Sequence, residues 1–101
     1  CGYSNLAAVV GATYPKELKE IRTQLEAVFF LIPGFGAQGG GAADIKAGFD
    51  EDGRGAVVNS SRGINFACRK EEYSHFGAEN YAKAARAAAE KMKYEINDVL
   101  K

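Results

Sequence analysis

The chain has 101 residues, of which 47% are hydrophobic and 26% are charged, and its 13 basic residues balance 13 acidic ones. This length and composition allow one globular unit at most. The formal net charge of zero gives no electrostatic reason to expect binding to nucleic acid or to an anionic membrane. No stretch reaches the roughly 18 apolar residues of a membrane span.

Cysteine and histidine usage argues against a disulfide framework or a metal site. Cys1 and Cys68 are the two cysteines, and they lack metal-ligand spacing. A reduced, cytoplasmic setting is therefore expected. His75, the single histidine, has no partner at ligand spacing, so it is expected to pack or to face solvent beside Phe76. The chain opens on Cys without an initiator Met and close to a strand, and is expected to be a piece of something longer.

The first expected unit is a strand followed by a helix. Residues 6–10 form a continuous apolar run, which is typical of a strand covered on both faces in a parallel sheet. Pro15 then stands where a first helical turn tolerates proline. Residues at helical spacing follow it with Lys and Glu between them: Leu18, Ile21, Arg22 and Leu25.

Two more units repeat this rhythm. An apolar run at 28–32 leads through a Gly-rich loop into a helix over about 42–49, which ends in the turn residues 50–53. A third apolar run at 55–58 turns through 59–63. The β-α-β-α-β order predicts an α/β fold with right-handed crossovers and a parallel sheet.

The last quarter of the chain predicts one long amphipathic helix over about 77–100. Its apolar stripe is expected to cover the outside of the sheet. The stripe consists of Tyr81, Ala85, Ala88, Met92, Ile96 and Val99. Residues 69–72, before the helix, are expected to form a solvated loop.

Two loops follow buried strands and carry the chemistry. Residues 32–41 are rich in glycine, which lets backbone N–H groups approach an oxyanion. Gln38 adds an amide donor, and Arg62 in the second loop adds a planar fork suited to two phosphate oxygens. Together they predict a phosphate site. The alternative is a flexible Gly linker and a solvated surface arginine.

The two loop motifs resemble those of a known family. Pro-Gly-Phe-Gly-Ala-Gln-Gly-Gly at 33–40, with Asn-Ser-Ser-Arg-Gly-Ile at 59–64, is similar to the end of orotidine 5′-phosphate decarboxylase, most of all to its longer bacterial subgroup. The similarity extends upstream through residues 9–15 and downstream into the final helix. It implies that residues 1–101 are the C-terminal three β/α units, strands 6 to 8, of one TIM (β/α)8 barrel, which needs about 250 residues when complete.

The resemblance also implies roles for individual residues. Family members convert orotidine 5′-monophosphate to UMP and carbon dioxide without metal or organic cofactor. Side chains that hold the substrate phosphate are matched by Gln38 and Arg62, and backbone amides that share this load are matched by Gly39, Gly40, Ser61 and Gly63. Pro33 matches a residue lining the pyrimidine pocket, with Phe35 at an apolar position nearby. The family's catalytic lysine and carboxylates have no match, so this chain alone is expected to be inactive. Asp44-Ile45-Lys46 with Asp50 has the wrong spacing for that motif and is expected to be a solvated helix face.

The expected partners are orotidine 5′-monophosphate and UMP, the remaining N-terminal part of the same barrel, and a second copy of the complete enzyme in a homodimer. Without that barrel, interior side chains would meet water, among them some of Val9, Phe30 and Val57. Two other functions remain open. One is another phosphate-binding barrel lyase or synthase acting on a sugar phosphate, and the other is a non-catalytic phosphate-binding module.

Overall fold

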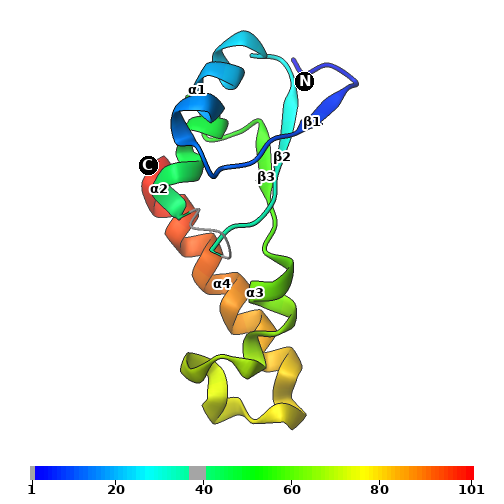
Figure 1. Ribbon diagram of the computed structural model, residues 1–101, viewed down its shortest axis with the longest axis vertical. Coiled ribbons are helices and arrows are strands. Elements are labelled where there is room, and N and C mark those ends of the chain that lie inside the picture. The colour runs from blue at the N-terminus through cyan, green and yellow to red at the C-terminus, as the bar shows by residue number, and fades with distance from the viewer. Residues whose placement is uncertain (1, 37–40) are drawn as a thin grey trace.

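A computed structural model of the protein describes residues 2–36 and 41–101 (Figure 1). Helices and strands alternate, as expected for an α/β chain. In order they are β1 (Ala7–Val9), α1 (Pro15–Gln24), β2 (Phe29–Ile32), α2 (Ala42–Ile45), β3 (Ala56–Val58), α3 (Ser61–Asn65) and α4 (Tyr81–Leu100). Short 3₁₀ turns lie at Lys46–Gly48, Ala67–Arg69, Glu71–Phe76 and Ala78–Asn80. No helix among the described residues is long and apolar enough to cross a membrane.

The three strands form one parallel sheet in the order β1-β2-β3, as the β-α-β-α-β rhythm predicts. Val9 is in register with Leu31, and Leu31 with Val57, so the three side chains form a row on one face. That face is open in the described structure: Val9 is 71% exposed and Val57 is 50% exposed. The expectation that the sheet is covered on both faces is therefore not met by this chain alone.

The opposite face of the sheet carries the core. Phe30 and Ile32 of β2 are fully buried there against Leu18 of α1 and Ile45 of α2, and all helices that cover the sheet lie on this side (Figure 1). Some of Val9, Phe30 and Val57 were expected to face water. Val9 and Val57 do so, whereas Phe30 is fully buried, because the two-residue period places its side chain on the face opposite to that of Leu31. Ile45 also corrects the expectation of a solvated helix face at residues 44–46.

Helix α4 covers the sheet only with its C-terminal half. Ile96 belongs to the core cluster of the sheet, whereas Ala84 packs with Ala67 and Tyr73 of the 3₁₀ turns below the sheet (Figure 1). Tyr81 was expected in the apolar stripe but is exposed. Tyr81 is the first residue of α4 and directly follows the 3₁₀ turn at Ala78–Asn80, so it lies at the exposed start of the helix.

Arg22 is the one strongly buried cation among the described residues, at 8% exposure. Its Nε and Nη2 donate to the Gly48 carbonyl at 2.9 and 2.7 Å, Nη2 donates to the Gly55 carbonyl at 2.8 Å, and Nη1 donates to the Val28 carbonyl at 2.8 Å. Loss of hydration on burial lowers the pKa of this guanidinium. Arg22 thus holds the amino ends of β2 and β3 to the end of the 3₁₀ turn after α2.

A hydrogen bond between the side chains of Tyr3 and Asp50 lies beside Arg22, at the same end of the sheet. The Tyr3 hydroxyl donates to the Asp50 carboxylate, which also accepts from the backbone N–H groups of Arg54 at 2.8 Å and Asp52 at 3.0 Å. These hydrogen bonds, with that of Tyr3 the largest cause, lower the pKa of Asp50, and the same bond raises the pKa of Tyr3. The Tyr3–Asp50 hydrogen bond fixes the segment before β1 to the turn before β3.

Candidate functional site

The two predicted loops lie side by side at the carboxyl end of the sheet. The loops follow β2 and β3, which are neighbouring parallel strands, so both loops begin at the same end of the sheet. The Asn59 N–H donates to the Ile32 carbonyl at 3.2 Å, and the Phe35 N–H donates to the Asn59 carbonyl at 3.3 Å. The backbones of the two loops are therefore hydrogen-bonded to each other.

Ser60 adds a third bond between the loops. This residue is 6% exposed, and its Oγ donates to the Phe35 carbonyl at 2.8 Å. A Cβ atom placed on Gly63 would lie 2.4 Å from the same Oγ, which is closer than any real contact. A side chain at position 63 would therefore force the Ser60 hydroxyl to shift. The sequence analysis gave Ser60 no role; the available signal was its position between the end of the third apolar run and Gly63.

The predicted residues of the first loop are only partly described. Gln38, Gly39 and Gly40 lie outside the described residues. Pro33 is half-buried directly after β2. Phe35 is 9% exposed and belongs to the core cluster, so little of its surface is accessible to a ligand. A role of Pro33 and Phe35 in a pyrimidine pocket stays a prediction.

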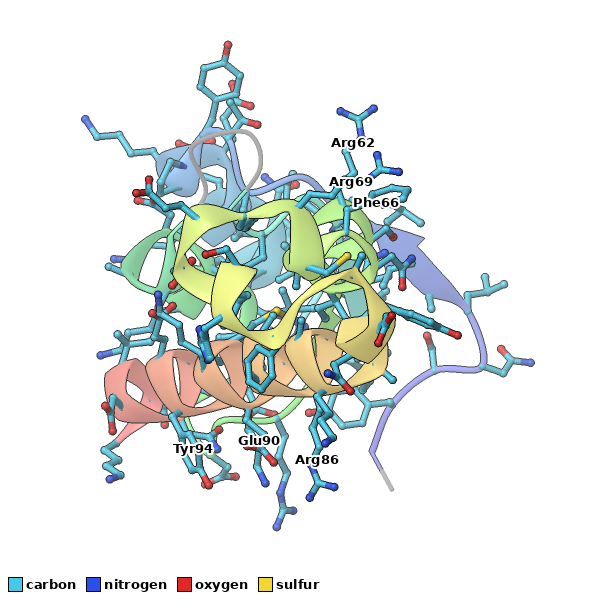
Figure 2. All side chains as sticks on the ribbon, turned by 90° about the horizontal axis from the view of Figure 1, so that it is seen from below. Arg62, Phe66, Arg69, Arg86, Glu90 and Tyr94 are labelled. Atoms are coloured by element: carbon cyan, nitrogen blue, oxygen red, sulfur yellow. The ribbon has the colours of Figure 1, made fainter. Side chains whose placement is uncertain are left out.

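The second loop opens directly into α3, which brings Ser61, Arg62 and Gly63 into one turn. Ser61 and Arg62 are exposed, and Gly63 is half-buried. Figure 2 shows the Arg62 side chain projecting away from the ribbon, near Phe66 and Arg69. Arg62 makes no ion pair with any other residue of 2–36 and 41–101, whereas the Arg69 guanidinium carbon lies 4.7 Å from the Phe66 ring centroid. The Arg62 fork is thus available to a ligand in the described structure.

A small hollow of about 170 Å³ lies beside the two loops. It is lined by Phe35, Gly36, Ser60 and Gly63 from the loops, and by charged side chains from the 3₁₀ segment and α4, which are Lys70, Glu72, Lys91 and Glu95. Lys91 Nζ lies 3.0 Å from the Glu72 carboxylate, and this contact raises the pKa of Lys91. The charges in this hollow are therefore largely paired within the chain.

A larger hollow, of about 830 Å³, lies at the other end of the sheet, beside Arg22 and the turn at 50–52. Its lining mixes Lys19 and Lys46 with Glu26 and Glu51 and favours no one sign of ligand. In residues 2–36 and 41–101 no three His, Cys, Asp or Glu side chains are grouped so that they could hold a metal ion. His75 is exposed, with its ring centroid 4.2 Å from that of Phe76.

Comparisons with known proteins agree with the loop motifs. No family model matches the chain. Curated proteins named orotidine 5′-phosphate decarboxylase match nearly all of it: that of Rhodopirellula baltica is 50% identical over 96 residues, covering 94% of this chain and 32% of the relative. That of Clostridium kluyveri is 48% identical, covering 95% of this chain and 32% of the relative. The chain thus spans about a third of the length of these relatives.

Solved structures give the same result at the level of the fold. The Leishmania donovani UMP synthase superposes with a TM-score of 0.62 and 33% identity over 95% of this chain and 18% of that protein. A putative orotidine-monophosphate-decarboxylase from Toxoplasma gondii superposes with a TM-score of 0.61 and 31% identity over 93% of this chain and 29% of that protein. The resemblance inferred from the two loops is confirmed, and over nearly its whole length the chain is homologous to part of an orotidine 5′-phosphate decarboxylase.

Proposed function

We propose that the chain is the phosphate-binding portion of an orotidine 5′-phosphate decarboxylase, which converts orotidine 5′-monophosphate to UMP and carbon dioxide in de novo pyrimidine biosynthesis. The observation that carries the proposal is that hydrogen bonds join the two loops at the carboxyl end of the sheet, in a chain that is 50% identical to a decarboxylase of this name. In TIM barrels the loops after strands 7 and 8 are the usual phosphate site.

In this proposal β1, β2 and β3 are strands 6, 7 and 8, and residues 1–101 are the C-terminal part of one (β/α)8 barrel. The open face supports it: the row formed by Val9, Leu31 and Val57 lies opposite the helices, where a barrel has its interior. Both β1 and β3 are edge strands in the described sheet, and closure into a barrel removes such edges. The proposal assigns the other strands of the barrel to the part of the relatives that this chain does not cover, about two thirds of their length.

The substrate phosphate lies, in this proposal, between the two loops. Arg62 supplies a charged fork and Gln38 a neutral donor from the facing loop. Backbone N–H groups of Gly39, Gly40, Ser61 and Gly63 share the phosphate, and Pro33 and Phe35 border the pyrimidine. Binding energy from a phosphate that does not react can close a loop and hold the site in its reactive form, so it appears in the rate as well as in affinity.

In this proposal, residues of the remaining N-terminal part of the barrel catalyse the cleavage of the bond that releases carbon dioxide. There a lysine protonates the carbanion that carbon dioxide leaves behind, and neighbouring aspartates destabilise the substrate carboxylate. No residue of this chain takes either role, and no cofactor is needed. The complete enzyme is proposed to be a cytoplasmic homodimer.

The test is complementation by the missing strands. This chain would be expressed alone and together with a polypeptide carrying the first two thirds of a curated relative; the complex is called the assembled protein below. Carbon dioxide release from orotidine 5′-monophosphate is expected only from the assembled protein. Turnover by this chain alone would overturn the assignment of chemistry to the missing strands. An assembled protein that acts on a ketose phosphate and leaves orotidine 5′-monophosphate unchanged would overturn the substrate.

A further inference from the structure

Three side chains form a row that begins at Arg62 and continues along one side of the chain. The Phe66 N–H donates to the Arg62 carbonyl at 3.1 Å, and the Arg69 N–H donates to the Phe66 carbonyl at 3.0 Å. Phe66 therefore follows Arg62 by one turn of α3, and Arg69 follows Phe66 by one 3₁₀ turn. Residues one turn apart are neighbours on a helix surface. Figure 2 accordingly shows the three side chains on the same side of the molecule.

Phe66 holds the second arginine of this row in place. The Phe66 residue is 47% exposed, although phenylalanine is among the residue types most often buried. The Arg69 guanidinium carbon lies 4.7 Å from the centroid of its ring, which is within the range of a cation–π contact. This contact restricts the movement of a long side chain that is otherwise exposed. The ring thus keeps the Arg69 charge on the side where Arg62 projects.

The charge of the row is not balanced within the described structure. Neither Arg62 nor Arg69 forms an ion pair with another residue of 2–36 and 41–101. The cations of α4 differ, since Arg86 pairs with Glu90 at 3.0 Å and Lys91 with the Glu72 carboxylate at 3.0 Å. Two guanidinium groups on one side of a short segment repel each other, and a bound anion replaces this repulsion by attraction. The row is therefore suited to an anionic ligand.

We propose that Arg69 is a second cation of the phosphate site and binds the substrate phosphate together with Arg62. The inference rests on the proposed function and extends it to a residue that neither the loop motifs nor the comparisons assign a role. A phosphate monoester carries a charge of about −1.5 to −2 at pH 7, so one guanidinium neutralises it only in part. A guanidinium already held on a ring loses little freedom when it binds a ligand, which makes the second contact effective.

The variant that tests this is Arg69→Met in the assembled protein, because Met keeps an unbranched apolar side chain that can lie against the Phe66 ring and removes the charge. Arg69→Lys keeps a cation at the same position. Arg86→Met is the matched control, since Arg86 is an exposed arginine that Figure 2 shows on the opposite side of the molecule. Each protein would be assayed at low and high salt with orotidine 5′-monophosphate and with orotidine, which lacks the phosphate. Binding of UMP and of uridine would be measured by titration calorimetry.

For Arg69→Met we expect kcat/KM for the phosphorylated substrate to fall about tenfold, the equivalent of one lost charge-assisted hydrogen bond. The value for orotidine should stay within about twofold, since that substrate offers no anion to the row. Affinity for UMP should fall with kcat/KM while that for uridine stays unchanged. The losses should shrink at high salt, because exposed charges are screened. Arg69→Lys should recover most of the activity, and Arg86→Met should change none of these quantities.

Two results would overturn the inference while leaving the proposed function intact. Equal losses of Arg69→Met with both substrates would make Arg69 a structural residue. Parent values of kcat/KM and of UMP affinity would show that the phosphate is bound without it. An inactive assembled protein without any substitution would contradict the proposed function instead, and the comparison of UMP with uridine binding would still decide whether Arg69 binds a phosphate group.

Discussion

The guanidinium carbon of Arg22 lies 3.7 Å from the centroid of the ring of Phe30, a fully buried core residue. Within residues 2–36 and 41–101 no carboxylate forms an ion pair with this cation. Backbone carbonyls in its plane and the face of an aromatic ring take the place of a counter-ion. Planar arginine fits this arrangement, whereas a lysine ammonium cannot reach several carbonyls in one plane.

Arg22→Met is expected to lower the free energy of unfolding of the assembled protein by more than about 2 kcal/mol, because it leaves buried carbonyls without donors. Arg22→Lys should recover only part of this loss. Urea unfolding would measure both. Arg86→Met is the control, since Arg86 is exposed and, among the described residues, forms its ion pair with Glu90 one helical turn away. Equal stabilities for the Arg22 and Arg86 variants would contradict the role of the buried network.

The stability of the assembled protein in acid is expected to depend on the Tyr3–Asp50 hydrogen bond. The folded state lowers the pKa of Asp50, so its contribution is complete above the ordinary value of about 3.9 and is lost as the pH falls through the folded value. Tyr3→Phe removes the largest cause of this shift. The variant should therefore lose less stability than the parent when the pH falls below about 4. Tyr94→Phe, an exposed tyrosine on α4, is the control. Parallel pH profiles for Tyr3→Phe and the parent would contradict this reading.

Arg62→Ala should cost the assembled protein about 3 kcal/mol of transition-state stabilisation, or roughly 100-fold in kcat/KM, because it removes charge-assisted bonds to a dianion. The loss should largely disappear with orotidine. Gln38→Ala should behave alike but with about half the effect, since the donor is neutral. Arg86→Ala is the control, because Figure 2 shows Arg86 on the side of the molecule opposite Arg62. A loss of the same size with and without phosphate would make Arg62 structural.

Gly63→Ala should lower the activity of the assembled protein, since the new methyl group would displace the Ser60 hydroxyl from the Phe35 carbonyl at the base of the two loops. Its expected signature is selective loss of activity toward the phosphorylated substrate. Gly11→Ala provides a comparison for folding, because no heavy atom of the described residues other than its chain neighbours lies within 4 Å of a Cβ at that position. Full activity of Gly63→Ala would show that Ser60 can move without harm.

The chain is expected to stay bound to the rest of its barrel or, when it is isolated, to self-associate. Val9 and Val57 are exposed on the open sheet face, and burial of each such side chain is worth roughly 1.5 to 3 kcal/mol. The stability of a whole domain is only about 5 to 15 kcal/mol. Sedimentation velocity of the purified chain at micromolar concentration would measure its mass. A cooperatively melting monomer of 10.8 kDa would contradict the expectation.

Local sequence determined the elements and their order. Apolar runs bounded by Gly, Pro and Asp place the strands, because turn residues interrupt a chain at fixed points. The motifs around Gln38 and Arg62 pointed to their family, because loops that hold a ligand restrict both backbone shape and donors. These features depend on neighbours along the chain, and a single sequence displays them.

Contacts between distant segments were decided only by the tertiary structure. Arg22 stands in an apolar stripe by spacing, yet its burial depends on carbonyls from Gly48 and Gly55, which only the packed sheet brings to it. Phe30 and Leu31 are both apolar, and the strand pattern does not say which one faces the helices. Ser60 reads as an ordinary helix cap, and its bond to Phe35 exists because parallel pairing of β2 and β3 brings the two loops together. Side-chain direction and long-range hydrogen bonding are properties of the assembled layers, so no local pattern encodes them.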